Sequence, residues 1–89
     1  MALTKETVVD KIEVMEMGEV QVRTATRVLE DGAVLSTSFH RHYLEPSTKD
    51  SGSWADTDIS GEDTRVQAVA NATWTNSVKT AYQAMIDAT

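Results

Sequence analysis

The chain has 89 residues, with 14 acidic and 8 basic side chains, a formal net charge of −6 and no cysteine. A chain of this length forms one domain with one modest core, and we expect residues 1–89 to be that single domain. The lack of cysteine excludes disulfides and Cys-based metal sites, and the lack of a basic patch argues against nucleic acid as a partner. No apolar run approaches the roughly 18 residues of a membrane span, and the N-terminal residues lack a secretory-signal pattern, so no membrane partner is expected.

Three segments in which apolar and polar residues alternate predict an antiparallel β-meander in residues 1–45. Gly18 and Gly32 stand at the joins, and each can take the positive φ that a tight hairpin turn needs. The expected strands are residues 7–15, 19–29 and 33–43.

The pattern of the first hairpin also predicts its register, because a slip of one residue sends every side chain to the other face. A three-residue loop at residues 16–18 pairs Val14 with Val20 and Ile12 with Val22. A two-residue loop would instead set charged residues against the apolar face. The first-strand residues expected on the apolar face are Val8, Ile12 and Val14.

The second hairpin is expected to turn through a two-residue loop at Asp31-Gly32. Uninterrupted pairing from this loop sets Val28 opposite Leu35 and Thr24 opposite Phe39, all on the apolar face. Val20 then pairs with Tyr43 on the same face. The polar side chains expected together on the opposite face are Arg23, Arg27, His40 and His42.

Residues 46–60 are polar and rich in turn-forming residues, and they predict a long loop after the third strand. Pro46 ends that strand because it cannot donate to a ladder. Trp54 and Ile59 are the large apolar residues of the loop, and we expect one of them to hold it to the core.

Two helices are expected in residues 61–89, over about 61–71 and 75–87. Ser60 is the expected N-cap of the first helix and Thr75 that of the second. Together they form a helical hairpin that covers the apolar face of the meander. The expected fold class is therefore α+β, with a three-stranded antiparallel meander in one layer and the helices in the other.

The sheet edges are the first feature that bears on function. A three-stranded sheet has two exposed edges, and the outer strands carry few charges that point inward to block pairing. A core this small also commonly gains support from oligomerisation or from a partner. We therefore expect a homo-oligomer or docking into a larger assembly.

His40 and His42 are the first candidates for chemistry. They stand two residues apart, so both side chains leave one face of the strand about 7 Å apart, which is compatible with one metal ion. In the predicted register their neighbours are Arg23 and Gln21, and no carboxylate is placed as a third ligand, although Glu19 could come near. Two surface histidines are the simpler interpretation, with a metal site or a pH-sensitive contact as alternatives.

Residues 56–61, DTDISG, match the first six positions of a calcium-binding loop. The match fails at its eighth position, Asp63, where an apolar residue is usual. It fails again at the twelfth, where Gln67 replaces the bidentate glutamate. We expect a solvated acidic loop that leads into a helix.

Patterns typical of catalysis are missing from the sequence. The serines lack a Gly-x-Ser-x-Gly context, and the isolated glycines form no phosphate-binding pattern. No nucleophile or orienting acid is placed beside His40. We expect a protein that is not an enzyme, with no cofactor and no small-molecule substrate.

The two tryptophans have different expected roles. Aromatic residues are favoured at interfaces, but in a small core they more often pack inside. Trp74, between the two helices, is expected in the core. The sequence does not decide whether Trp54 lies in the core or at an interface. Of the aromatic residues, Trp54 is our preferred interface anchor.

Six short motifs follow one another along nearly the whole chain. They are DKIEV at 10–14, RTAT at 23–26, FHRHYLEP at 39–46, SGEDTRVQAVA at 60–70, ATWT at 72–75 and AYQA at 81–84. In this order they resemble a group of small proteins encoded by tailed bacteriophages and prophages, often among tail or other virion genes. Members have a shorter loop after the third strand, so residues 49–58 resemble an insertion. The group brings no catalytic residues to carry over.

The resemblance implies a phage origin, in the virion or in the host cytoplasm. The leading hypothesis is a small structural or accessory virion protein, associated with tail or capsid, that contacts other virion proteins or further copies of itself. One alternative is a non-virion phage protein that binds a host protein or assists assembly, and another is a His-based metal-binding protein. The residues expected at contact surfaces are Trp54, Arg23, Arg27, His40 and His42.

Overall fold

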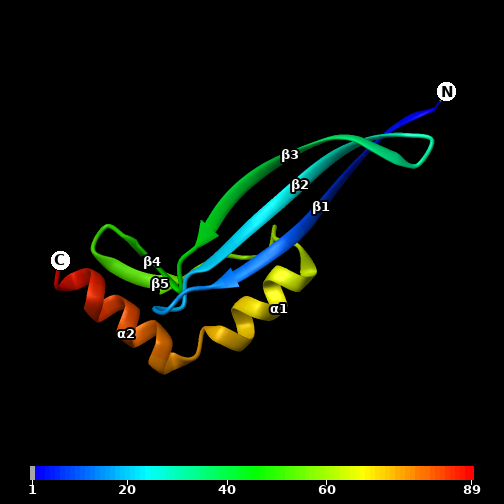
Figure 1. The fold of residues 1–89 in the computed structure, drawn as a ribbon. Coiled ribbons are helices and arrows are strands. Elements are labelled where there is room, and N and C mark those ends of the chain that lie inside the picture. The colour runs from blue at the N-terminus through cyan, green and yellow to red at the C-terminus, as the bar shows by residue number, and fades with distance from the viewer. Residues whose placement is uncertain (1) are drawn as a thin grey trace.

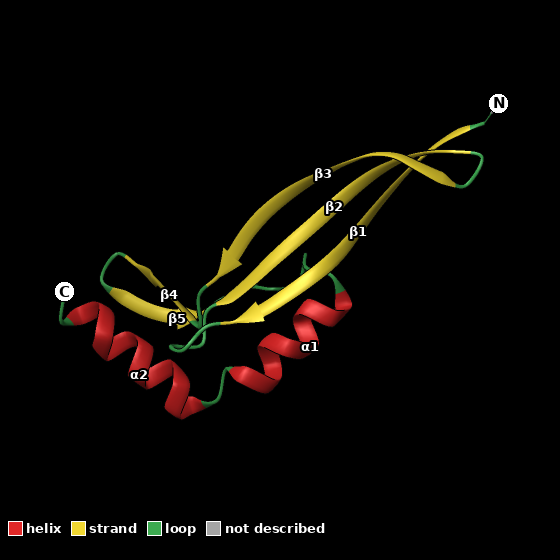
Figure 2. Ribbon diagram, viewed as in Figure 1, coloured by secondary structure: helices red, strands yellow, loops and turns green. Residues whose placement is uncertain are grey.

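The computed structural model describes residues 2–89 and has the predicted α+β architecture (Figures 1 and 2). A three-stranded antiparallel sheet has the order β1-β2-β3, and a separate two-stranded sheet pairs β4 with β5. Two helices follow at the C-terminal end. The elements are β1 (Leu3–Val14), β2 (Val20–Glu30), β3 (Ala33–Leu44), β4 (Ser47–Asp50), β5 (Ser53–Asp56), α1 (Thr64–Thr73) and α2 (Asn76–Asp87).

The β1–β2 hairpin has the predicted three-residue loop, with Gly18 at φ 92°. Val14 pairs with Val20 and Ile12 with Val22, as the apolar pattern requires. Further along β1 the register shifts by one residue between Val9 and Lys11. This β-bulge brings Val9 to the core side, so the expectation that Val8 lies there is wrong.

The β2–β3 hairpin turns at Asp31-Gly32 as predicted, with φ values of 52° and 85°. Its predicted register is wrong beyond the turn, because a second bulge shifts the pairing between Val28 and Leu29. Leu35 is the extra residue on β3, so Val28 pairs with Ser36. Every later side chain of β3 therefore lies on the face opposite to the predicted one.

The segment predicted as an irregular loop is instead a short hairpin, β4–β5, which turns at Ser51 and Gly52 with φ values of 52° and 84°. A two-residue turn with positive φ at both positions matches the twist of the flanking strands. The amide of Gln83 on α2 donates to the buried hydroxyl of Ser47 at 3.0 Å. The hairpin is thereby fastened to the second helix.

Helix α1 begins at Thr64, three residues later than predicted. Its N-cap is Asp63, whose carboxylate accepts the backbone N–H of Arg65 at 2.8 Å, and the expectation that Ser60 caps the helix is wrong. Both residues are good cap types and lie close together, so the sequence alone does not decide between them. Helix α2 has the predicted cap, with the Thr75 hydroxyl accepting from the N–H of Val78.

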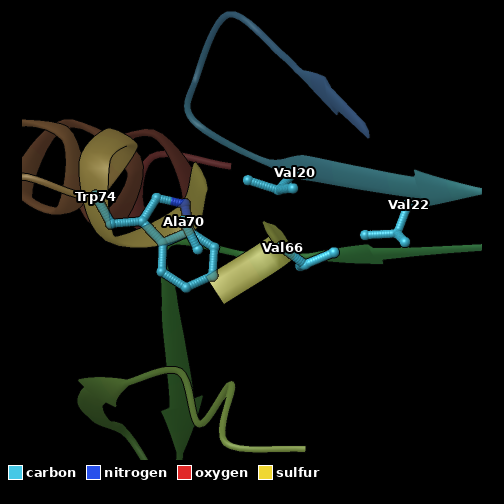
Figure 3. Packing of buried hydrophobic residues seen from close by; sticks show 5 residues of the cluster. All are labelled: Val20, Val22, Val66, Ala70 and Trp74. Atoms are coloured by element: carbon cyan, nitrogen blue, oxygen red, sulfur yellow. The ribbon is translucent and has the colours of Figure 1, made fainter. Parts of the chain in front are cut away.

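The core lies between β2 and α1 and is shown in Figure 3. Val20 and Val22 of β2 face Val66 and Ala70 of α1, and all four are fully buried. Trp74, at the end of α1, is 8% exposed and donates from Nε1 to the carbonyl of Gly18 at 2.7 Å. This confirms the core assignment of Trp74. Helix α2 packs instead along β4, so the two helices cover different sheets.

The molecule is elongated, with extents of 56 × 23 × 22 Å. Its radius of gyration is 16.8 Å, whereas a compact domain of this length has about 12 Å. The excess comes from the far part of the sheet, where residues 3–8 of β1 pair with residues 25–30 of β2 and these with residues 33–39 of β3. This part projects beyond the helices (Figure 1). We call this projection the arm.

Candidate functional site

The sheet has one face covered by α1 and one open face. Val20 and Val22 point to α1, so the alternate residues of β2 point to the open face. On this face a row of three side chains crosses all three strands: Asp10 of β1, Arg23 of β2 and Phe39 of β3.

Arg23 holds this row together. Its Nε and Nη2 atoms donate to the two carboxylate oxygens of Asp10 at 3.0 and 2.8 Å, a bidentate pair. Its guanidinium also lies 4.4 Å from the centre of the Phe39 ring, in a cation–π contact. The hydrogen bond with Arg23 holds the pKa of Asp10 below its ordinary value, and the same bond raises the pKa of Arg23.

Arg27 also lies on the open face and pairs with Glu6 of β1 at 2.9 Å. The expectation that Arg23 and Arg27 share a face is therefore confirmed by the register. Both cations are tied to carboxylates on β1. The open face thus presents ordered ion pairs beside the exposed ring of Phe39.

His40 and His42 do not lie with the two arginines, and the prediction of a single polar face is wrong here. The bulge at Leu35 turns both histidines to the side of α1, where His40 pairs with Thr24 and His42 with Val22. The two rings stack with centroids 6.3 Å apart. His42 Nε2 lies 2.8 Å from a carboxylate oxygen of Glu62 before α1.

The geometry around these histidines gives no metal site. Within residues 2–89 there is no group of three or more His, Cys, Asp or Glu placed to hold a metal ion. The acids of the partial calcium-loop match make other contacts. Asp56 pairs with Lys79 of α2 at 2.9 Å. Asp58 accepts the N–H of Ser60 at 2.9 Å, a bond that lowers the pKa of Asp58.

Trp54 is half-buried on β5 and packs against α2. From β5 its ring meets Tyr82 of α2 edge-on, with centroids 6.2 Å apart, and its Nε1 donates to Asp87 at 3.3 Å. Lys49 pairs with the same carboxylate at 2.8 Å. Burial raises the pKa of Tyr82 to about 12. Trp54 therefore packs from β5 against α2 with part of its side chain accessible, and its role as an interface anchor stays a prediction.

The exposed aromatic residues are Phe39 and Tyr43, which the sequence analysis placed in the core. Their side chains are 51% and 64% exposed. Leu35, at the bulge, is 57% exposed. The alternation along β3 shows which residues share a face, but not which of the two faces is covered by α1. The bulge at Leu35 decides this, so the periodic pattern alone could not reveal that Phe39 and Tyr43 are exposed.

A groove of about 180 Å³ lies between the β1–β2 loop and α2. Its lining residues are Glu16, Met17, Ser77, Val78 and Ala81. Sites for drug-sized molecules measure about 300–1,000 Å³. The open face and the β3 edge are much more extended, and they form the candidate contact surface.

No protein-family model, curated protein or solved structure matches the chain. In the part of the chain that the structure describes, no helix is long and apolar enough to cross a membrane. The contact surface itself is therefore the basis for assigning a function.

Proposed function

We propose that this chain is a small structural or accessory protein of a tailed-phage particle, associated with tail or capsid, and that it acts by protein–protein contact. The observation that carries the contact role is the arm and its apolar side chains. Leu3, Val34, Leu35 and Phe39 are each more than half exposed along it. Val34 and Phe39 share the open face, and exposed apolar side chains gathered on one face of a small protein typically mark a contact site.

The elongated shape supports the same role. Part of each strand in the main sheet extends beyond the helices and has no layer packed against it (Figure 2). A core of a few buried residues must support this extension, and small domains commonly rely on a partner for such support. The phage origin is supported by the ordered sequence motifs.

Mass spectrometry of purified particles tests the virion role. Particles from a phage that encodes the chain should contain it in reproducible copy number after density-gradient purification and a high-salt wash. Absence from particles, with the chain present in the infected-cell lysate, would refute the virion role. It would favour the non-virion alternative, binding to a host protein or assistance in assembly.

A matched pair of variants tests whether the arm is the contact. Leu35→Ser removes an exposed apolar side chain from the arm, and Met15→Ser removes one, 48% exposed, at the other end of the sheet. Both changes should leave the fold intact, as measured by circular dichroism. Particles should lose the Leu35→Ser protein and keep the Met15→Ser protein. Equal retention of both would overturn the role of the arm.

A further inference from the structure

Strand β3 is an open edge of the sheet. It runs for 12 residues beside β2 alone, and Arg41 is its single Lys, Arg, Asp or Glu residue. Exposed edges pair readily with further strands unless charges, bulges or covering segments protect them. One bulge, at Leu35, lies near the start of β3, and the stretch from Ser36 to Leu44 pairs with β2 without interruption.

The other edge, β1, is protected in each of these ways. It carries charged residues along its length, its bulge lies mid-strand at Asp10, and Arg65 of the α1 region donates to the carbonyl of Val9. The contrast singles out β3 as the pairing edge. The charged residues of β1 are Lys5, Glu6, Asp10, Lys11 and Glu13.

We infer that a second copy of this chain docks on β3, antiparallel and about a two-fold axis at Phe39, so that two sheets join into one of six strands. The second copy is one specific partner within the contact role proposed above, and the inference rests on that role. The new ladder continues the existing β2–β3 ladder in the same plane.

The register follows from the pleat. A two-fold axis perpendicular to the sheet keeps α1 of both copies on one side, and partners opposite each other must then share a face. The axis must therefore lie at a residue that pairs with the same residue of the second copy. Axes at Ser38 and at Phe39 give the longest overlap along β3, from 33 to 43 and from 34 to 44.

The axis at Phe39 gives better side-chain pairs. It sets Phe39 against the second copy's Phe39 and Leu35 against its Tyr43, so apolar residues meet on the open face. Aromatic and aliphatic pairs of this kind stabilise antiparallel sheets. The alternative axis sets Leu35 against Arg41 and leaves Tyr43 opposite Ala33.

Charge favours self-pairing in this register. Arg41, the charged residue of β3, faces Thr37 of the second copy and not another cation. On the open face each Phe39 ring already lies against Arg23, which is neutralised by Asp10. The row Asp10–Arg23–Phe39 would then run across the axis into the same row of the second copy.

The contact area predicts a weak dimer. Eleven paired residues at about 3.4 Å each extend for about 37 Å, and an edge about 10 Å deep buries on the order of 800 Å² over both copies. This lies below the roughly 1,000 Å² that a stable specific interface buries, and is in the range of weak or transient contacts. We therefore expect a weak dimer whose population rises with protein concentration in solution.

Single cysteines test the axis directly, because the natural chain has none. Opposite side chains of an antiparallel pair have Cβ atoms about 4.5–5.5 Å apart, which a disulfide can bridge with a small adjustment. Phe39→Cys should therefore cross-link to itself under mild oxidation. Thr37→Cys is the matched control, since its two copies would lie four residues apart, about 13 Å.

The expected result is at least about tenfold more covalent dimer for Phe39→Cys than for Thr37→Cys at equal concentration. Because Phe39→Cys also removes the aromatic pair, the double variant T37C/R41C is tested as well. It keeps Phe39 and should give a dimer joined by two disulfides, identified by peptide mapping.

Equal cross-linking of the two single variants, or a T37C/R41C protein that stays monomeric, would overturn the inference. A dimer of T37C/R41C without the Thr37–Arg41 linkage would overturn the register. The virion measurement is independent of these outcomes. A chain found in particles but not cross-linked through β3 would contact another virion protein, and only the self-pairing would fail.

Discussion

The turn at Gly18 packs the first hairpin against both helices. A Gly18→Ala substitution measures how much this packing contributes to the free energy of unfolding. Gly18 has φ +92°, where an L residue is strained by about 1–2 kcal/mol. A Cβ added there would lie 2.5 Å from Cγ1 of Val78 and 3.2 Å from Cγ of Pro46. Overpacking of this kind costs about 1–3 kcal/mol. We therefore expect Gly18→Ala to lower the free energy of unfolding by about 2–5 kcal/mol.

Gly52→Ala separates the two contributions. Gly52 has a similar backbone, with φ +84°, but an added Cβ would meet nothing within 4 Å. Its substitution should cost only the backbone strain, about 1–2 kcal/mol. Urea unfolding followed by circular dichroism gives both values. A domain of this length has about 4–13 kcal/mol in total, so Gly18→Ala should shift the midpoint strongly.

Equal effects of the two substitutions would show that the Gly18 loop is not packed. If Gly18→Ala and Gly52→Ala lose equal free energy, the loop at Gly18 does not pack against Val78 and Pro46. In that case α1 would be the only helix that packs against the main sheet. Restored stability in a Gly18→Ala, Val78→Ala double variant would confirm that the contact with Val78 is the cause.

Three further substitutions test other parts of the structure. Thr75→Ala removes the N-cap of α2 and should cost about 1 kcal/mol in urea unfolding, whereas equal stability would mean that the cap is replaced. Trp54→Ala removes an edge-to-face contact with Tyr82 and should cost at least about 0.5–1.5 kcal/mol, while leaving the solution mass unchanged; a changed mass with unchanged stability would instead support Trp54 as an interface anchor. Asp10 has a pKa held below its ordinary value of 3.8, so its pairing with Arg23 stabilises the fold above that pH and this stability is lost as pH falls through the lowered pKa. Asp10→Asn should therefore show a smaller loss of stability between pH 5 and pH 2, measured by thermal unfolding; an unchanged loss would contradict the pairing.

The turns and the helix cap that the sequence predicted correctly are formed by residues close together in the chain. Gly18 and Asp31-Gly32 provide the positive φ values that tight turns require, and the structure uses both turns as expected. Thr75 precedes a clear apolar stripe, and it caps α2 as expected. In each case the residues that form the feature are neighbours in the chain.

The bulges could not be predicted from the sequence in this way. The extra residues at Asp10 and Leu35 are set by how whole strands pair, and either residue also fits a regular strand. One bulge exchanged Val8 for Val9 in the core. The other moved Phe39 to the open face and His42 to the helix side, and this changed the candidate surface.

The β4–β5 hairpin was missed for a different reason. Its strands have four residues each and are mostly polar, so they lack the alternation that predicts a strand. They are stabilised by contacts distant in sequence, including the edge-to-face contact of Trp54 with Tyr82 and the hydrogen bond from Gln83 to Ser47. A turn signal at Ser51-Gly52 was present, but it stood between segments that looked irregular.

We propose that the open β3 edge is a protein-contact surface and that it first accepts a second copy of the chain. Light scattering after size-exclusion chromatography, from about 1 µM to about 1 mM, tests it most directly. The mass should rise with concentration from 9.8 kDa to twice that value, and Phe39→Lys, which sets like charges on the axis, should remain a folded monomer. A wild-type mass of 9.8 kDa at every concentration, or a Phe39→Lys protein that dimerises equally well, would contradict the account.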